Sequence, residues 1–103
     1  DFSLAINKIY KKLDKIDRNW KKKKIKARFV CVMTIYWPDG KSVSKSGSIK
    51  GIISSKKKGT NGFGYDPIFI PENKKITFGQ MLLKKKLKID HRYRAYKRIK
   101  KFL

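Results

Sequence analysis

The sequence predicts an α/β domain with a long β-hairpin, a short third strand and flanking helices. Residues 27–37, ARFVCVMTIYW, form a continuous run of β-branched, aromatic and other apolar side chains, which is typical of a strand. The PDG sequence at 38–40 favours a tight turn, and residues 41–54 return as the second arm of the hairpin. Apolar residues spaced three and four apart near both ends of the chain indicate helices.

The N-terminal helix is expected over residues 3–17, with Ser3 as its N-cap. One apolar face is formed by Ile6, Ile9, Leu13 and Ile16. The basic residues 18–26 that follow are expected to be a linker.

The strand at 27–37 is apolar on both faces, so we expect it inside the sheet rather than at an edge. Its single cysteine, Cys31, cannot form an internal disulfide and is expected to be a small core residue. In the second arm, Gly47 and Gly51 indicate a bulge or a bend.

The C-terminal third is expected to contain one strand and two helices. PIFI at 67–70 is predicted to be a short strand that ends at Pro71. Thr77 is a candidate N-cap of a short helix, and Asp90 is expected to cap a helix over 91–103. The apolar face of that last helix is formed by Ala95, Ile99 and Phe102.

The chain of 103 residues carries a formal net charge of +22, with 29 basic and seven acidic residues. Only five of the basic residues are arginines, although base and phosphate recognition favours arginine. The lysine runs at 21–24, 56–58 and 84–86 are expected on loops or exposed faces. We therefore interpret the excess of lysine as mainly compositional, with only nonspecific nucleic-acid binding at low salt.

Several function classes find no support in the sequence. No apolar run approaches the roughly 20 residues of a membrane helix, and no signal-peptide pattern is present, so no membrane partner and a cytoplasmic location are expected. There is no nucleotide-binding P-loop and no Cys/His cluster with metal-binding spacing. The acidic residues are scattered and do not form a Mg²⁺ site: Asp1, Asp14, Asp17, Asp39, Asp66, Glu72 and Asp90.

Two short segments are candidates for ligand binding. In NGFGYDP at 61–67, glycines allow a ligand to approach the backbone, Phe63 or Tyr65 offers a stacking face, and Asp66 can accept hydrogen bonds from a purine or ribose. A tight structural turn with two packed aromatics is the alternative.

In the second segment, KLKIDHR at 86–92, Lys86, His91 and Arg92 gather near an expected helix N-terminus, which suits a phosphate or a carbonyl oxygen. The alternative is a capped helix with a solvated basic first turn.

Four segments, taken in their order along the chain, closely resemble the C-terminal half of the inosine-triphosphatase family. They are ARFVCV, GTNGFGYDPIF, TFGQM and the lysine and His-Arg pair within 86–92. These pyrophosphatases cleave non-standard purine triphosphates such as ITP, dITP and XTP. The resemblance covers nearly all of 1–103. It implies the C-terminal part of the mixed-sheet fold of that family, and hydrolysis of the triphosphate to monophosphate and pyrophosphate.

The resemblance also implies a set of substrate-binding residues, namely Phe63, Gly64, Tyr65, Asp66, Lys86, His91 and Arg92. The first aromatic stacks on the purine, and the Gly-Tyr-Asp segment lines the base and sugar pocket. Lys86 contacts the nucleotide, while His91 and Arg92 read the 6-oxo group. Donors that face a carbonyl oxygen accept hypoxanthine or xanthine, whereas the 6-amino group of adenine would face another donor.

The family's phosphate loop and Mg²⁺-binding acid have no counterpart in the sequence. Residues 1–103 are thus expected to be the C-terminal half of a single pyrophosphatase domain, inactive alone, with Mg²⁺ ligands in the other half. The complete protein is expected to be a homodimer that takes purine triphosphates as substrates. Two alternatives remain, a nucleotide-binding remnant without catalysis and a basic RNA-binding protein.

Overall fold

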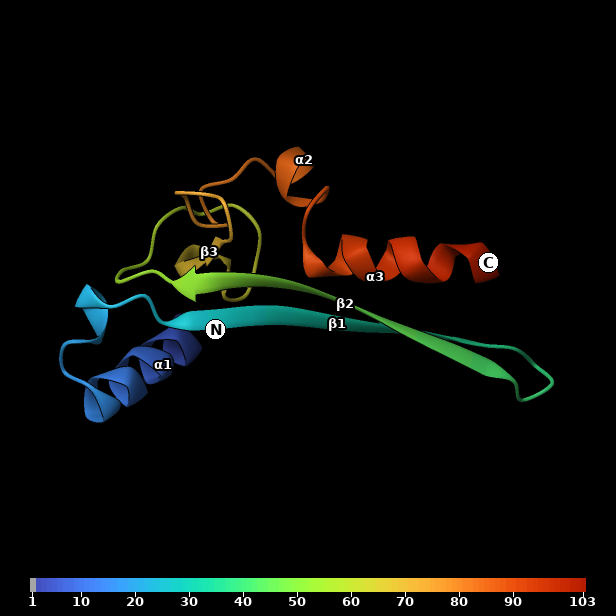
Figure 1. The fold of residues 1–103 in the computed structure, drawn as a ribbon, viewed down its shortest axis with the longest axis horizontal. Coiled ribbons are helices and arrows are strands. Elements are labelled where there is room, and N and C mark those ends of the chain that lie inside the picture. Colours follow the sequence, from blue (N-terminus) through green and yellow to red (C-terminus); the bar gives the residue numbers. More distant parts are fainter. Residues whose placement is uncertain (1) are drawn as a thin grey trace.

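The computed structural model describes residues 2–103 as three helices, three strands and short 3₁₀ turns around one sheet (Figure 1); Asp1 lies outside the described residues. The elements are α1 (Phe2–Ile16), β1 (Lys26–Tyr36), β2 (Ser42–Ile53), β3 (Phe69–Pro71), α2 (Leu83–Lys86) and α3 (His91–Ile99). The strands form an antiparallel sheet in the order β1-β2-β3. The predicted α/β class, with a long hairpin, a short third strand and flanking helices, is confirmed.

The hairpin is long and regular. Each residue of β1 pairs with one residue of β2, so the bulge that Gly47 and Gly51 indicated as one of two possibilities is wrong. Gly47 instead lies against α3, where an added Cβ would be 2.7 Å from the carbonyl carbon of Arg94. At Gly51 an added Cβ would be 2.6 Å from the ring of Phe69. Both glycines allow close packing against the strand rather than a change of register.

β1 differs from the prediction of an interior strand, because in the described part of the chain it pairs only with β2 and is an edge strand. Its burial alternates along its length, with the inner face half-buried and the outer face exposed. Val32 on the outer face is 64% exposed. Cys31 lies on the inner face, half-buried and free.

The hydrophobic core lies between the inner face of the sheet and the chain that leads into α3. Its centre is formed by Ile49, Phe69, Phe78 and Met81. Phe29 of β1 packs against this cluster, and its ring centroid lies 4.2 Å from that of Phe69 in a stacked arrangement. This core therefore joins the hairpin to the segment that carries the candidate site residues.

Residues 18–26, predicted to be a linker, contain a buried tryptophan that packs against α1. Trp20 is only 1% exposed, in a short 3₁₀ turn, and its Nε1 donates to Asp14 Oδ1 at 2.8 Å. Its ring packs against Tyr10, whose hydroxyl donates to the carbonyl oxygen of Ser54 at 2.9 Å. These contacts hold α1 against the end of β2, which a linker would not do.

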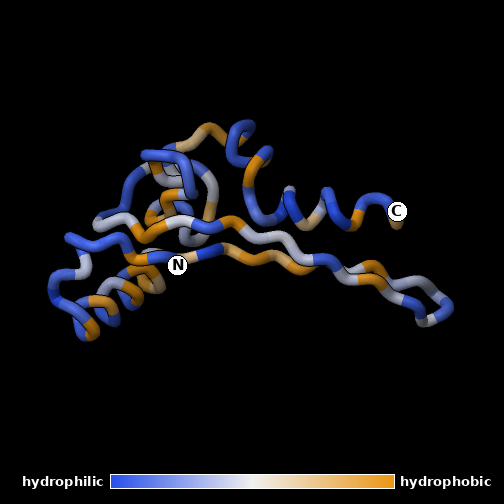
Figure 2. The backbone as a smooth tube through the Cα atoms, in the orientation of Figure 1, coloured by the Kyte–Doolittle hydropathy of each residue, from blue (hydrophilic) through white to orange (hydrophobic). Residues whose placement is uncertain are grey.

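α1 itself begins one residue earlier than predicted, so Ser3 lies in its first turn rather than at the cap position. Of the predicted apolar face, Ile6 is buried, but Ile16 at the other end is 80% exposed. Figure 2 shows apolar and polar residues alternating along α1, whereas α3 is mostly polar. No helix in the described range 2–103 is long and apolar enough to cross a membrane.

The short elements of the C-terminal part shift from their predicted positions. β3 starts at Phe69 because Asp66–Ile68 forms a 3₁₀ turn. Thr77 does not start a helix. The Thr77 N–H donates to Gln80 Oε1 at 3.0 Å, and the Gln80 N–H donates to Thr77 Oγ1 at 3.2 Å. The helix α2 begins only at Leu83.

α3 is capped as predicted, since Asp90 Oδ1 accepts a hydrogen bond from the Tyr93 N–H at 2.8 Å. Ala95 and Ile99 are buried, but the helix ends at Ile99 and the following 3₁₀ turn leaves Phe102 exposed.

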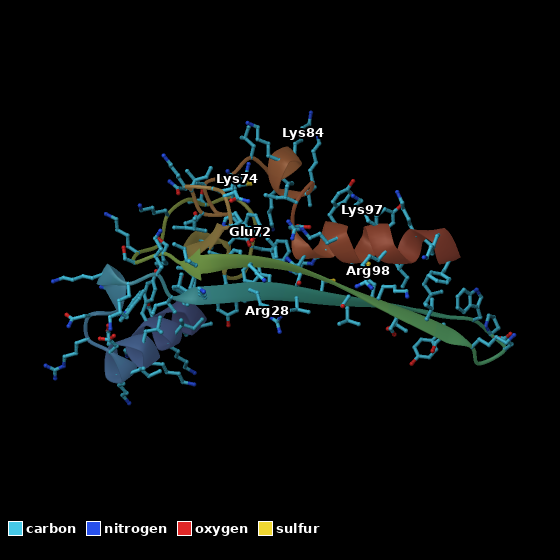
Figure 3. All side chains as sticks on the ribbon, in the orientation of Figure 1. Arg28, Glu72, Lys74, Lys84, Lys97 and Arg98 are labelled. Atoms are coloured by element: carbon cyan, nitrogen blue, oxygen red, sulfur yellow. The ribbon has the colours of Figure 1, made fainter. Side chains whose placement is uncertain are left out.

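The charged residues lie mainly at the surface, and Lys84 and Lys97 project away from the sheet in Figure 3. Arg98 of α3 instead donates to the carbonyl oxygen of Ser46 in β2 at 2.8 Å. The lysine runs at 21–24 and 56–58 are exposed as expected.

Candidate functional site

A cavity of about 180 Å³ lies where the glycine-rich loop meets the N-terminus of α3. Six of the seven residues named from the sequence line it, namely Phe63, Gly64, Tyr65, Asp66, His91 and Arg92. Two further residues, Phe2 and Phe29, complete its wall. The loop and the helix N-terminus are therefore parts of one site, although more than 20 residues separate them in the sequence.

The glycine-rich loop is closed around the carboxylate of Asp66. Gly62 and Gly64 have positive φ angles of 72° and 67°, which favour glycine over residues with a side chain. A Cβ on Gly62 would lie 3.0 Å from Asp66 Cγ. Asp66 Oδ2 accepts a hydrogen bond from the Phe63 N–H at 3.0 Å. These constraints set the position of the Phe63 ring at the cavity.

Lys86 lies behind the loop rather than on the cavity wall. It is 1% exposed, so the expectation that the whole run 84–86 is exposed is wrong at this residue. Its Nζ donates to Asp66 Oδ2 at 2.6 Å and lies 4.5 Å from the centroid of the Phe63 ring. The ion pair compensates both buried charges and holds the loop against the core.

The N-terminus of α3 carries the two remaining site residues. The guanidinium carbon of Arg92 lies 4.2 Å from the centroid of the Phe63 ring. The His91 ring packs against Phe29, with the two ring centroids 5.0 Å apart. An aromatic face and two hydrogen-bond donors thus meet at one cavity, an arrangement that can bind a planar heteroaromatic ring with a carbonyl oxygen at its edge.

The electrostatics of the site favour the neutral form of His91. Burial lowers the pKa of His91 below its ordinary value of 6.5, the charges of Arg92 and Lys86 lower it further, and Asp90 opposes the shift. His91 Nδ1 and Asp90 Oδ2 are buried and have no hydrogen-bond partner within the described part of the chain. A neutral imidazole has one N–H donor, so His91 can offer one donor to a ligand.

This pKa shift predicts how stability depends on pH. Because the pKa of His91 is lower in the folded state, the unfolded chain binds the additional proton, and folding is destabilised as the pH falls below about 6.5. His91→Gln should flatten the decrease in unfolding free energy between pH 7 and 5, measured by urea unfolding. Equal pH dependence in the variant and the parent would contradict the shift.

The described residues also show which side chains are available to bind a metal ion. Residues 2–103 contain no group of three or more His, Cys, Asp or Glu side chains that could hold a metal ion. Asp66, the acid at the cavity, is already paired with Lys86. These residues do not fit a Mg²⁺ site.

Comparisons with known proteins show the family to which the chain belongs. The model of the Ham1 family matches residues 2–102. The chain belongs to the Ham1 family. This confirms the resemblance seen in the sequence, because curated Ham1 relatives are named dITP/XTP pyrophosphatases.

Relatives of known sequence and structure match this Ham1 chain over almost its whole length. The dITP/XTP pyrophosphatase of Caulobacter vibrioides is 37% identical over 97% of the chain and 50% of its own length. That of Oceanobacillus iheyensis is 38% identical over 95% of the chain and 48% of its own length. The Staphylococcus aureus Ham1 structure superimposes with a TM-score of 0.85 at 32% identity, covering 99% of the chain and 50% of that protein. The chain therefore spans about half the length of the curated relatives it matches.

Proposed function

We propose that this Ham1 chain recognises the base of 6-oxopurine nucleoside triphosphates, within a protein that hydrolyses ITP, dITP and XTP to monophosphate and pyrophosphate. The observation that carries the proposal is the convergence of Phe63, His91 and Arg92 at one cavity. The names of the relatives, dITP/XTP pyrophosphatases, support the same substrate class.

Five of the residues at the cavity have a direct chemical role in this proposal. The Phe63 ring stacks on the purine, and the neighbouring Gly64 and Tyr65 line the base and sugar. His91 and Arg92 donate hydrogen bonds to the 6-oxo oxygen. Adenine has an amino group at this position, so the same donors would be left unpaired in a partly buried site, which costs free energy.

The ion pair between Asp66 and Lys86 supports the base-binding loop. With Asp66 Oδ2 already accepting from Lys86 and from the Phe63 N–H, the pair holds the ring of Phe63 in position. Asp66 lines the cavity and can contact the nucleotide directly, whereas Lys86 is 1% exposed behind the loop and would reach the nucleotide only if the loop moved.

The catalytic part of the reaction is assigned to the half of the Ham1 fold that this chain does not span. We propose that this half supplies the Mg²⁺ ligands and the phosphate contacts, that the complete protein is a homodimer, and that it acts in the cytoplasm.

The decisive variant is Arg92→Ala, made in the full natural polypeptide that carries this chain. Loss of a charged donor to the 6-oxo oxygen should lower kcat/KM for ITP about 10- to 100-fold and leave the low value for ATP almost unchanged. Arg98→Ala is the matched control, because Arg98 lies on the same helix but contacts Ser46 of β2 instead. An unchanged ratio of kcat/KM for ITP and ATP in Arg92→Ala would contradict the assignment.

Two other outcomes separate this function from the alternatives. Saturable binding of ITP without turnover in the full natural polypeptide would identify a nucleotide-binding remnant. The net charge of +22 favours nonspecific RNA binding, which should disappear at about 200 mM salt because it depends on counterion release. RNA binding that survives this salt concentration would favour an RNA-binding protein instead.

A further inference from the structure

We propose that Phe2, the first described residue of α1, is a specificity-determining residue that forms a second aromatic wall for the purine base. This inference rests on the proposed function of the cavity. Phe2 lines the same cavity as Phe63, His91 and Arg92, although it lies 61 positions before Phe63 in the sequence.

The ring of Phe2 lies directly on the base-binding loop. Its centroid is 5.5 Å from that of Tyr65 in an edge-to-face arrangement. Three of its ring carbons lie 3.6 to 4.0 Å from the position of a Cβ built on Gly64. A side chain on Gly64 would therefore contact this ring, and the glycine keeps the space between the ring and the loop open.

The position of Phe2 is set by a packed helix. Ile6, one turn further along α1, is buried, and the Tyr10 hydroxyl ties the helix to the carbonyl oxygen of Ser54 at 2.9 Å. Phe2 as a residue is nevertheless 51% exposed. A ring that is fixed at the mouth of a cavity and still half exposed can bury its remaining apolar surface against a ligand.

A second aromatic wall selects for the size of the base. The glycine-rich loop contributes the aromatic side chains of Phe63 and Tyr65 to the cavity wall, and α1 contributes that of Phe2. A purine has two fused rings and can contact both groups of side chains, whereas a pyrimidine has one ring and less surface to bury. Phe2 therefore favours purine over pyrimidine nucleotides, while His91 and Arg92 distinguish the 6-oxo group.

The test measures the dissociation constants of IMP and UMP with the full natural polypeptide that carries this chain. Loss of base–aromatic contact in Phe2→Ala should weaken IMP binding by about tenfold or more and change UMP binding much less. Phe2→Tyr should bind IMP like the parent, because it keeps the ring. Leu4→Ala is the matched control, since Leu4 is an exposed apolar residue of the same helix that does not line the cavity.

The outcomes separate this inference from the proposed function. If Phe2→Ala binds IMP like the parent while Arg92→Ala binds it more weakly, the role of Phe2 is wrong and the base pocket stands. If the parent does not bind IMP, the pocket itself is wrong. Circular dichroism and the thermal midpoint verify folding. If Phe2→Ala is unfolded, Phe2→Leu replaces it, and equal IMP affinity in that variant and in Phe2→Tyr would overturn the aromatic role.

Discussion

Replacing Lys86 by methionine should destabilise the fold by about 3–5 kcal/mol, because it leaves a buried carboxylate without its partner. The Lys86 and Asp66 side chains are 1% and 4% exposed, and a single ion pair of 2.6 Å joins them. Without the ammonium group, Asp66 Oδ2 keeps only the Phe63 N–H as a donor. The free energy of unfolding in urea measures the loss.

Two further variants distinguish the loss of the ion pair from the loss of any lysine. Lys85→Met changes an exposed neighbour by the same chemistry and should alter stability by less than about 0.5 kcal/mol. The double variant Lys86→Met with Asp66→Asn removes both charges and should recover part of the stability. A Lys86→Met protein as stable as Lys85→Met would show that the buried pair contributes nothing.

Replacing Gly47 by alanine should destabilise the fold by about 3 kcal/mol, at the upper end of typical overpacking costs. The added methyl group would lie 2.7 Å from the carbonyl carbon of Arg94 and still closer to the backbone of Ala95 and His91. Backbone atoms cannot rotate away as a side chain does, so α3 would have to move from the sheet. Urea unfolding measures the effect.

The same substitution should also weaken nucleotide binding, because α3 carries His91 and Arg92 at its N-terminus. Ser48→Ala is the control, since Ser48 is the next residue of β2 and is exposed on the opposite face of the sheet. Its effect on both measurements should be small. If Gly47→Ala matched Ser48→Ala in stability and in affinity for IMP, the close packing of α3 on β2 would not matter to the site.

Local chemistry in the sequence was sufficient to predict the hairpin, the cap of α3 and most of the site. A continuous apolar run followed by PDG can form few structures other than a strand and a turn. Asp90 satisfies a free N–H of the helix that follows it, an interaction between residues three positions apart. The site motif was recognisable because glycines with positive φ and a fixed aromatic position restrict the residue types in the loop.

The boundaries that the sequence missed depend on competition between neighbouring elements. The 3₁₀ turn at Asp66–Ile68 displaces the start of β3, and the hydrogen bonds between Thr77 and Gln80 close a single turn without continuing into a helix. Each of these segments is too short for periodicity to decide its structure. Within residues 2–103 β1 pairs only with β2, which was also missed, because apolar residues on both faces do not show which strand lies beside them.

The sequence by itself thus determined the class of fold through local chemistry and spacing, and it pointed to the family and to six residues of the cavity wall through its resemblance to known pyrophosphatases. Only the tertiary structure decided that Lys86 is buried, that Trp20 anchors α1 and that Phe2 reaches the site. Lys86 and Phe2 depend on partners distant in the sequence, whereas Trp20 meets Asp14 and Tyr10 because the chain after α1 folds back onto the helix. A lysine in a run of lysines has no local feature that distinguishes it, and its charge is tolerated in the core only because folding brings Asp66 within 2.6 Å of it.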